Sequence, residues 1–189
     1  MTSGRRAAIA IVLWLGLTFA LASSGLLAFG SATPPPAMLV IAGATILTTF
    51  VGLSLPVERA SIAALIAFQV FRVFVEIFLW MGHRDGFVPI QMTWEGRNLD
   101  VLTGLSAPVV AWLASRRWIF VWNLAGLALL LNVVIVAILS MPTPLRAFHN
   151  EPSSAFVAGA PYIWLPVFLV QAAWFGHLAV FRWLRLRGI

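Results

Sequence analysis

The chain has 189 residues, of which 61% are hydrophobic and only 10% are charged. A soluble domain with this balance would lack the polar surface that keeps it dispersed, so the composition excludes a soluble globular domain and predicts a membrane protein. The formal charge of +6 comes from 12 arginines and no lysine, which are scattered along the chain instead of forming a patch, and this argues against nucleic acid as a partner.

Six apolar stretches, each long enough or nearly long enough to cross a bilayer, follow one another along the chain. They are Ala7–Gly30, Ala37–Leu55, Ala60–Met81, Leu99–Ser115, Trp118–Met141 and Pro161–Phe181. Because a crossing helix needs about 20 apolar residues, six crossings leave no room for a soluble domain. The sequence therefore predicts an all-α fold in which residues 1–189 form a single transmembrane domain, a bundle of about six helices.

The fourth stretch, Leu99–Ser115, is the shortest of the six. It is followed at once by Arg116 and Arg117, and then by the fifth stretch. This junction is either a very tight hairpin turn or a sign that the fourth stretch enters the membrane only in part. The sequence leaves both alternatives open.

The arginines indicate which side of the membrane the chain ends occupy. With six crossings, eight of them fall on the side of both ends, three fall on the opposite side, and Arg72 lies inside a helix. The eight are Arg5, Arg6, Arg59, Arg116, Arg117, Arg182, Arg185 and Arg187, and the three are Arg84, Arg97 and Arg146. Because cytoplasmic loops retain positive charge, both termini are predicted to be cytoplasmic.

Two loops on the opposite, outer side are longer than the other connections. They are Gly82–Asn98 and Pro142–Ala160. The cytoplasmic turns are too short to build a site, and loops on a rigid scaffold often carry functional residues. Any specific chemistry is therefore expected near these two outer loops.

Three polar residues share one face of the third stretch. Gln69, Arg72 and Glu76 are spaced by three and four residues, which places them along two helical turns. An ionised residue near the bilayer centre costs about 2.5–3.5 kcal/mol on insertion scales, so these side chains are expected to face the bundle interior. One interpretation is a polar cavity in the outer half of the bundle, with Glu76 as a proton carrier or general base and Arg72 as an anchor for an anion. The alternative is a direct salt bridge between Arg72 and Glu76 that fixes helix packing.

Two amides lie at a depth similar to that of the Arg72 group. Asn132 in the fifth stretch and Gln171 in the sixth would complete either arrangement. Each amide alone would be interpreted as a hydrogen-bonding contact between helices. Both are included among the candidate ligand-binding residues.

A polar segment directly before the fourth stretch lies at the outer membrane boundary. Asn98 or Asp100 is expected to cap the following helix by accepting its free amide protons, and Glu95 suits the positive end of the helix dipole. Arg97 is then left for an external anion, a lipid phosphate or Glu76. These four boundary residues are further candidates for ligand binding.

No cofactor and no metal site is predicted. The chain has no cysteine, which excludes thiolate ligands and cysteine nucleophiles. His149 lies in the last outer loop, on the same side as Glu95 and Asp100, but its spacing from these carboxylates matches no metal signature. It is kept as a candidate ligand-binding residue. His177 has no second intramembrane histidine with which to ligate a haem, so it is interpreted as a packed or lipid-facing side chain.

Two motifs give the chain a resemblance. The run Thr93–Asp100, T-W-E-G-R-N-L-D, is followed by Thr103–Pro108, T-G-L-S-A-P, and the later outer loop contains Pro142–Pro144 and Asn150–Pro152. Together they resemble a family of uncharacterised bacterial integral membrane proteins, from the third stretch to the C-terminus. The resemblance implies a multi-pass protein of the bacterial inner membrane. No activity is known for that family, so no catalytic role is transferred to any residue.

The predicted function is ligand binding, because it requires the fewest specific residues in the sequence. A membrane lipid, or another small amphipathic or anionic lipid-like ligand, would occupy the outer-half cavity, with Arg72 and Arg97 as contacts for the anion. Association into a homo-oligomer is compatible with this interpretation.

Two alternatives from other classes remain open. The first is an enzyme that processes lipid at the outer leaflet, with Glu76, Glu95 or Asp100 as the base and His149 as the acid or a metal ligand. The second is a small transporter, or the substrate-binding subunit of one. A transporter often shows inverted repeats, and no repeat is visible in the sequence.

Overall fold

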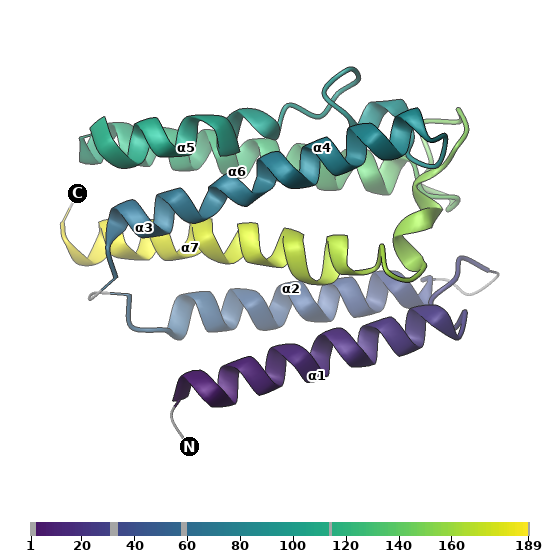
Figure 1. Cartoon of the computed structure of the whole chain (residues 1–189), viewed down its shortest axis with the longest axis horizontal. Coiled ribbons are helices and arrows are strands. Elements are labelled where there is room, and N and C mark those ends of the chain that lie inside the picture. The colour runs from purple at the N-terminus through teal and green to yellow at the C-terminus, as the bar shows by residue number, and fades with distance from the viewer. Residues whose placement is uncertain (1–2, 31–33, 58–59, 114, 189) are drawn as a thin grey trace.

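The computed structural model describes residues 3–30, 34–57, 60–113 and 115–188, and it is helical without strands over these ranges (Figure 1). The α-helices are α1 (Ser3–Ser23), α2 (Pro36–Ser54), α3 (Ile62–Ala67), α4 (Phe71–Arg84), α5 (Val101–Leu113), α6 (Arg116–Leu139) and α7 (Val170–Leu186). Three 3₁₀ turns, η1 (Phe68–Val70), η2 (Ile90–Met92) and η3 (Ser154–Ala158), and one π-helical turn, η4 (Leu165–Leu169), complete the secondary structure. The predicted all-α fold is confirmed.

Five helical segments of the described chain are long and apolar enough to cross a membrane. They are Gly4–Ser23, Pro36–Ser54, Ile62–Arg84, Arg116–Leu139 and Leu165–Leu186. These segments coincide with five of the six predicted stretches and indicate a membrane protein. The remaining stretch, the fourth, forms α5, which has 13 residues. At 1.5 Å per residue α5 is about 20 Å long, less than the roughly 30 Å of a hydrocarbon core, so the sixth crossing stays a prediction.

The outward-facing side chains are apolar, as contact with lipid requires. Phe50 on α2, Phe74 on α4 and Trp112 on α5 are among the large hydrophobic side chains that are exposed on the isolated chain. In water such a surface would be a contiguous patch prone to aggregation. Several buried positions are instead polar or charged, including Arg72 and Glu76. This polar interior under an apolar surface is the arrangement expected of a helical membrane protein.

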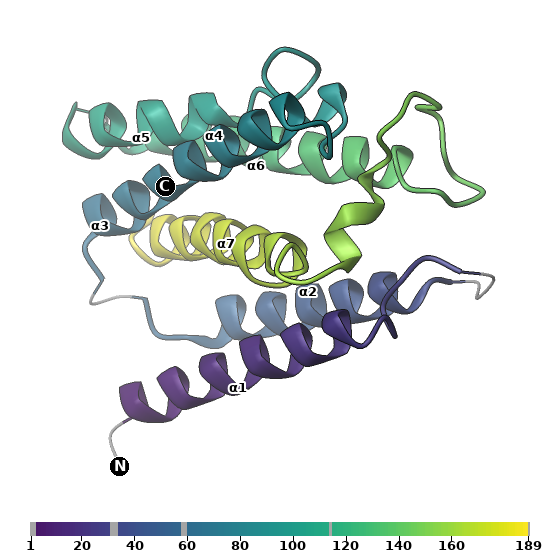
Figure 2. The same cartoon turned by 45° about the vertical axis from the view of Figure 1, so that its right-hand side comes forward.

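Successive long segments run in opposite directions, so both chain ends lie at one end of the bundle (Figures 1 and 2). The two long connections, between α4 and α5 and between α6 and α7, lie at the opposite end. Helix α7 is central, because it packs against α2 on one side and against α3 and α6 on the other. Of the arginines that predict the cytoplasmic side, Arg59 lies outside the described residues. The cytoplasmic placement of both ends remains a prediction.

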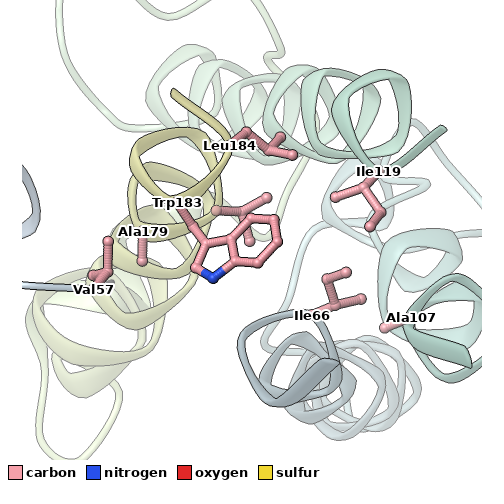
Figure 3. Packing of buried hydrophobic residues seen from close by; sticks show 8 residues of the cluster. Val57, Ile66, Ala107, Ile119, Ala179, Trp183 and Leu184 are labelled. Carbon is pink, nitrogen blue, oxygen red and sulfur yellow. The ribbon is translucent and has the colours of Figure 1, made fainter. Parts of the chain in front are cut away.

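A hydrophobic cluster closes the bundle at the end that holds the chain termini. Trp183 of α7 packs among Ile66 of α3, Ile119 of α6 and Leu184 (Figure 3). The indole Nε1 of Trp183 donates a hydrogen bond of 3.2 Å to the carbonyl oxygen of Ala60. The indole therefore fills the cluster while its polar atom is satisfied.

Helix α1 is the outermost helix and is attached through two tryptophans. Trp14 Nε1 on α1 donates to the carbonyl oxygen of Val167 at 3.1 Å. In the reverse direction, Trp164 Nε1 donates to the carbonyl oxygen of Leu15 at 3.1 Å. These bonds join α1 to the irregular start of the last helix.

Helix α7 is joined to α2 by two side-chain hydrogen bonds. Gln171 Nε2 donates to Thr45 Oγ1 at 3.0 Å, and Trp174 Nε1 donates to Thr49 Oγ1 at 2.8 Å. Gln171 Nε2 also donates to the carbonyl oxygen of Pro166 at 2.9 Å. Pro166 lies in the π-helical turn η4, where a proline cannot donate a backbone hydrogen bond. The glutamine thus stabilises an irregular turn as well as the helix contact.

Candidate functional site

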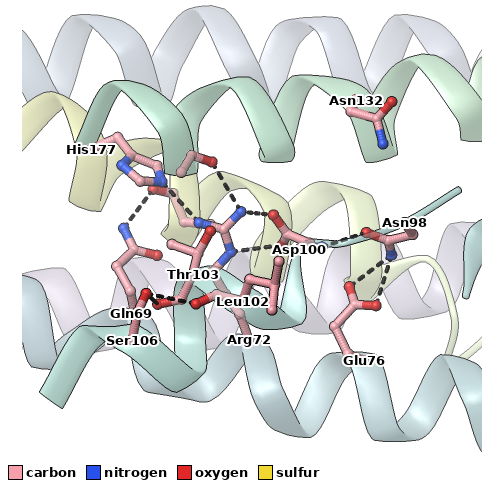
Figure 4. Close-up of polar contacts among 12 residues, drawn as sticks. Gln69, Arg72, Glu76, Asn98, Asp100, Leu102, Thr103, Ser106, Asn132 and His177 are labelled. Atoms are coloured by element: carbon pink, nitrogen blue, oxygen red, sulfur yellow. Dashed lines mark hydrogen bonds and ion pairs between the residues drawn. The ribbon is translucent and has the colours of Figure 1, made fainter. Parts of the chain in front are cut away.

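Arg72 is the centre of a polar network inside the bundle (Figure 4). Its side chain comes from α4 and is only 2% exposed. Nε donates to Asp100 Oδ2 at 2.6 Å, and Nη2 pairs with Asp100 Oδ1 in the same bidentate contact. Asp100 directly precedes α5, so this pair fastens the start of α5 to α4. A bidentate pair of this kind combines charge with a fixed orientation.

The salt bridge between Arg72 and Glu76, one of the two arrangements that the sequence left open, is not formed. The ion pair of Arg72 is with Asp100 instead. Asp100 approaches the guanidinium from the segment before α5, and Asn98 from the same segment holds the carboxyl group of Glu76, so each side chain has its own partner. Sequence spacing placed the two residues on one face, and this prediction is correct, but the partner comes from another segment.

Two further helices contribute to the network around Arg72. Nη1 of Arg72 lies 2.8 Å from His177 Nε2 on α7, and Nη2 donates to the carbonyl oxygen of Gly126 on α6 at 3.2 Å. His177 Nδ1 lies 2.8 Å from Asn123 Oδ1, and Asn123 Nδ2 donates to the carbonyl oxygen of His177 at 3.1 Å. The network therefore connects α4, α6, α7 and the residue before α5.

The hydrogen-bond partners assign the tautomer of His177. A guanidinium has only donors, so Nε2 of His177 accepts the hydrogen bond from Arg72. Nδ1 must then carry the proton and donate it to Asn123 Oδ1. This arrangement requires a neutral imidazole. The network consequently holds one positive guanidinium against one carboxylate, with His177 as an uncharged link.

Three glycines, one on each of three helices, allow the helices to approach closely around this network. A Cβ at Gly104 of α5 would lie 2.7 Å from Val73 Cγ2, and one at Gly126 would lie 2.7 Å from Thr103 Cγ2. A Cβ at Gly176 of α7 would lie 2.4 Å from Gln69 Nε2. Small residues at helix contacts are the usual means of close packing in membranes.

Glu76 is held separately, by an amide from the outer segment. Glu76 is 1% exposed, and Asn98 Nδ2 lies 2.8 Å from each of its carboxyl oxygens. Asn98 Oδ1 accepts the backbone N–H of Asp100 at 3.0 Å. Asn98 therefore links the carboxyl group of Glu76 to the residue that binds Arg72 (Figure 4).

This geometry corrects the predicted capping roles. The carboxylate of Asp100 binds Arg72 instead of the free amides of the following helix. Asn98 accepts an amide proton, but that of Asp100, the residue before α5. Glu95 is exposed, and its Oε1 accepts from the indole Nε1 of Trp80 at 2.7 Å. Asp100 and Glu95 therefore bind side chains of α4, Arg72 and Trp80, and not the backbone amides at the start of α5.

A cavity of about 510 Å³ lies between α2, α4, α6 and α7, next to the network. Its walls are predominantly aliphatic and aromatic, so the expectation of a polar cavity is wrong. Arg72, Glu76 and Asp100 lie on one wall, and Gln171 and Thr45 lie on another. The cavity belongs to the half of the bundle that carries the two long connections.

Four of the ten candidate residues, Arg72, Glu76, Asp100 and Gln171, line the cavity, and the other six lie elsewhere. Gln69 is buried and donates to the carbonyl oxygen of Ala173 at 3.1 Å. Asn98 lies behind Glu76, and Glu95, Arg97, Asn132 and His149 lie nearer the surface. These six residues do not line the cavity. Those that form hydrogen bonds hold neighbouring segments in place.

The remaining outer residues make local contacts. The guanidinium of Arg97 lies 5.2 Å from the centre of the Phe148 ring, and the carbonyl oxygen of Arg97 accepts from Asn132 Nδ2 at 2.7 Å. His149 is exposed. No group of three histidine, aspartate or glutamate residues in the described chain is arranged to hold a metal ion.

The last outer loop contains an exposed ion pair. Arg146 Nη2 lies 2.7 Å from Glu151 Oε1, and Arg146 also donates to the carbonyl oxygens of Phe148 and Asn150. The hydrogen bond from Arg146 lowers the pKa of the Glu151 carboxyl group below its ordinary value. Arg146 thus organises the loop through three acceptors.

Sequence reasoning missed His177 and Asn123. His177 was expected to be a packed or lipid-facing ring, whereas it is fully buried and bonded to two polar side chains. A signal was available, because Arg72, Asn123 and His177 are polar residues inside three apolar stretches, and such residues tend to find one another. Their pairing depends on helix order, which composition does not reveal.

The fold and the buried network together define a polytopic helical membrane protein with an internal polar core. The chain belongs to the family described as a domain of unknown function, DUF8737, whose family model matches residues 26–185. The matched region contains α2 to α7 with all ten candidate residues, and α1 precedes it. No curated protein and no solved structure matches the chain.

Proposed function

We propose that this protein binds an amphipathic, lipid-like molecule in the cavity between α2, α4, α6 and α7. The observation that carries the proposal is the cavity itself, which is apolar over most of its wall and has charged residues on one side. Its volume of about 510 Å³ lies within the roughly 300–1,000 Å³ of typical ligand pockets. An apolar chain with a polar head suits such a lining.

The position of the cavity supports entry from the bilayer. Ile46 on α2 and Leu131 on α6 line the cavity and are 72% and 43% exposed. Both belong to helices that are apolar and long enough to cross a membrane. The cavity therefore reaches the surface at side chains that would face lipid, and a ligand dissolved in the membrane enters without crossing water.

Binding is favoured over lipid processing because the proposed catalytic groups already have other partners. Asp100 is paired with Arg72, Glu95 accepts from Trp80, and Glu76 accepts from Asn98. His149, the proposed acid, does not line the cavity. A general acid and base must reach the same substrate, and these groups do not converge.

The proposal includes a place in the cell. Both described chain ends lie at one end of the bundle (Figure 1), and Arg5, Arg116 and Arg185 belong to the first turn of α1, the first turn of α6 and the last turn of α7. The positive-inside rule supports a cytoplasmic position for that end, and with this orientation the cavity would lie in the outer half of the membrane. The sequence resemblance supports the inner membrane of a bacterium.

The test compares the molecules that copurify with two matched variants. Val134→Trp places a large side chain in the cavity wall, and Val121→Trp places the same side chain at an exposed position of the same helix, away from the cavity. Lipidomic mass spectrometry after gentle extraction should show a specific amphiphile in wild type and Val121→Trp that is lost from Val134→Trp. The same set of molecules in all three proteins would contradict the proposal.

A further inference from the structure

The charges on the cavity wall restrict the head group that the proposed ligand carries. The charged residues that line the cavity are one cation, Arg72, and two carboxyl groups, Glu76 and Asp100. Arg97, the other cation expected to contact an anion, is exposed over Phe148 and does not line the cavity. The wall is therefore neutral when Glu76 is protonated and negative when it is ionised.

Arg72 is not available to bind an anion. Its guanidinium makes four hydrogen bonds, two to Asp100, one to His177 and one to the carbonyl oxygen of Gly126. Its charge is balanced by the bidentate contact with Asp100. An incoming anion would have to displace a buried carboxylate, and breaking such a pair is costly.

Glu76, in contrast, has capacity to accept further hydrogen bonds. Its two oxygens share the single amide nitrogen of Asn98, which also donates to the carbonyl oxygen of Met92 at 3.0 Å. A carboxylate offers about four acceptor positions, and one amide group has only two hydrogens. The ion pairs of the described chain do not include Glu76. Glu76 is thus a buried acceptor that is only partly satisfied.

Gln171 of α7, which also lines the cavity, offers a second acceptor. Its Nε2 donates to Thr45 Oγ1 and to the carbonyl oxygen of Pro166. The Thr45 hydroxyl donates to the carbonyl oxygen of Ile41 at 2.9 Å, which fixes Thr45 Oγ1 as the acceptor and so fixes the orientation of the Gln171 amide. Oε1 of Gln171 is buried without a hydrogen-bond partner. A buried acceptor without a donor is energetically unfavourable, so a ligand that donates a hydrogen bond to it would be stabilised.

We infer that the ligand of this cavity has a head group that donates hydrogen bonds, an amine or a hydroxyl, on an apolar chain, and that anionic heads are rejected. The inference rests on the proposed function and names its ligand class. Glu76 and Gln171 are the acceptors, and Glu76 also favours a cationic head over a neutral one. Rejection of anions follows from the carboxylate of Glu76, since the charges of Arg72 and Asp100 balance each other and a like charge placed beside Glu76 is unfavourable.

The test uses three amphiphiles with one 14-carbon chain: tetradecylamine, tetradecanol and tetradecyl phosphate. Their Kd values for the purified full chain in nanodiscs are measured by displacement of a radiolabelled tetradecanol. We expect the amine and the alcohol to bind at least about tenfold more tightly than the phosphate, a difference of about 1.4 kcal/mol. Glu76→Gln should remove the advantage of the amine over the alcohol, and Gln171→Leu should weaken both.

Glu95→Gln serves as the matched control, because Glu95 is exposed and does not line the cavity. It should leave all three Kd values unchanged. Equal affinity for the three heads, or tighter binding of the phosphate, would overturn the head-group inference while leaving cavity binding intact. If Val134→Trp does not weaken any of the amphiphiles, the cavity is not the binding site and both proposals fail. Should Glu76→Gln fail to fold, the comparison of the three heads on wild type decides the question alone.

Discussion

The guanidinium of Arg72 donates to the imidazole of His177 across 2.8 Å, although the two residues are 105 positions apart in the sequence. The contact connects α4 to α7, and His177 Nδ1 donates a hydrogen bond to Asn123 Oδ1 on α6. Since each of these groups is buried, removing one leaves another without a partner. The stability of the helix bundle therefore depends on the network as a whole.

Replacing His177 should destabilise the protein. His177→Ala leaves Arg72 Nη1 and Asn123 Oδ1 unsatisfied, and each buried unsatisfied group costs about 1–3 kcal/mol. The thermal melting temperature in detergent should fall clearly. His149→Ala, at an exposed histidine, should melt like wild type. Equal melting of the two variants would show that the network does not contribute to stability.

Breaking the buried ion pair should cost more than replacing both partners. Asp100→Asn leaves Arg72 charged and unpaired, and loss of one partner of a buried pair typically costs about 3–5 kcal/mol. The double variant Arg72→Met with Asp100→Leu removes both charges and should be more stable than Asp100→Asn. Unfolding by chemical denaturant in micelles measures both. A double variant less stable than the single one would contradict this account.

Gly126 should not tolerate a side chain. The Cβ of Gly126→Ala would lie 2.7 Å from Thr103 Cγ2 and 2.8 Å from His177 Cε1, and overpacking of this kind costs about 1–3 kcal/mol. Gly16→Ala is the control, because a Cβ there meets no atom within 4 Å. Thermal melting should be lowered for the first variant and unchanged or raised for the second. A Gly126→Ala variant as stable as Gly16→Ala would show that the helices do not pack this closely.

The loop ion pair should weaken in acid. Because the hydrogen bond from Arg146 lowers the pKa of Glu151, the contribution of the pair is present above the ordinary carboxyl pKa and is lost as pH falls through the lowered value. The pair is exposed, so the effect on global stability is expected to be small. An NMR titration of a selectively labelled Glu151 measures the pKa directly. In Arg146→Gln it should return toward the ordinary value, and an unchanged pKa would show that Arg146 is not the cause.

Single cysteines can test the sidedness of the helices, since the chain has none of its own. Asp85→Cys lies in the first long connection, and Ser115→Cys lies at the junction of α5 and α6. If both ends are cytoplasmic and α5 crosses the membrane, a membrane-impermeant maleimide added to intact cells should label only Asp85→Cys. Labelling of Ser115→Cys from outside would disprove the arrangement of six crossings with both ends in the cytoplasm.

The sequence predicted the helices better than the contacts. Apolar length located five segments correctly, because lipid imposes the same requirement on every crossing helix. It also placed Arg72 and Glu76 on an interior face, since buried charge has to avoid lipid. The pairing of Arg72 with Asp100 was not predictable, because it depends on where the start of α5 lies relative to α4.

The cavity was predicted to be polar because Gln69, Arg72 and Glu76 share one face of the third stretch. The structure shows that Arg72 and Asp100 satisfy each other and that aliphatic side chains form most of the wall. The arrangement of the helices in the bundle determines which apolar side chains meet. The periodicity of one segment carries no information about this arrangement. His177 was missed for the same reason, since its partners come from two other helices.

Helix α1 is attached to the matched family region by hydrogen bonds to backbone atoms. Trp14 and Trp164 bind backbone carbonyl oxygens, which every residue type supplies. Substitutions at the acceptor positions, Leu15 and Val167, therefore leave these two bonds in place. We expect α1 to diverge faster among relatives than the helices around Arg72, and to keep its docked position while its sequence drifts. The family match beginning at residue 26, after α1 ends, agrees with this expectation.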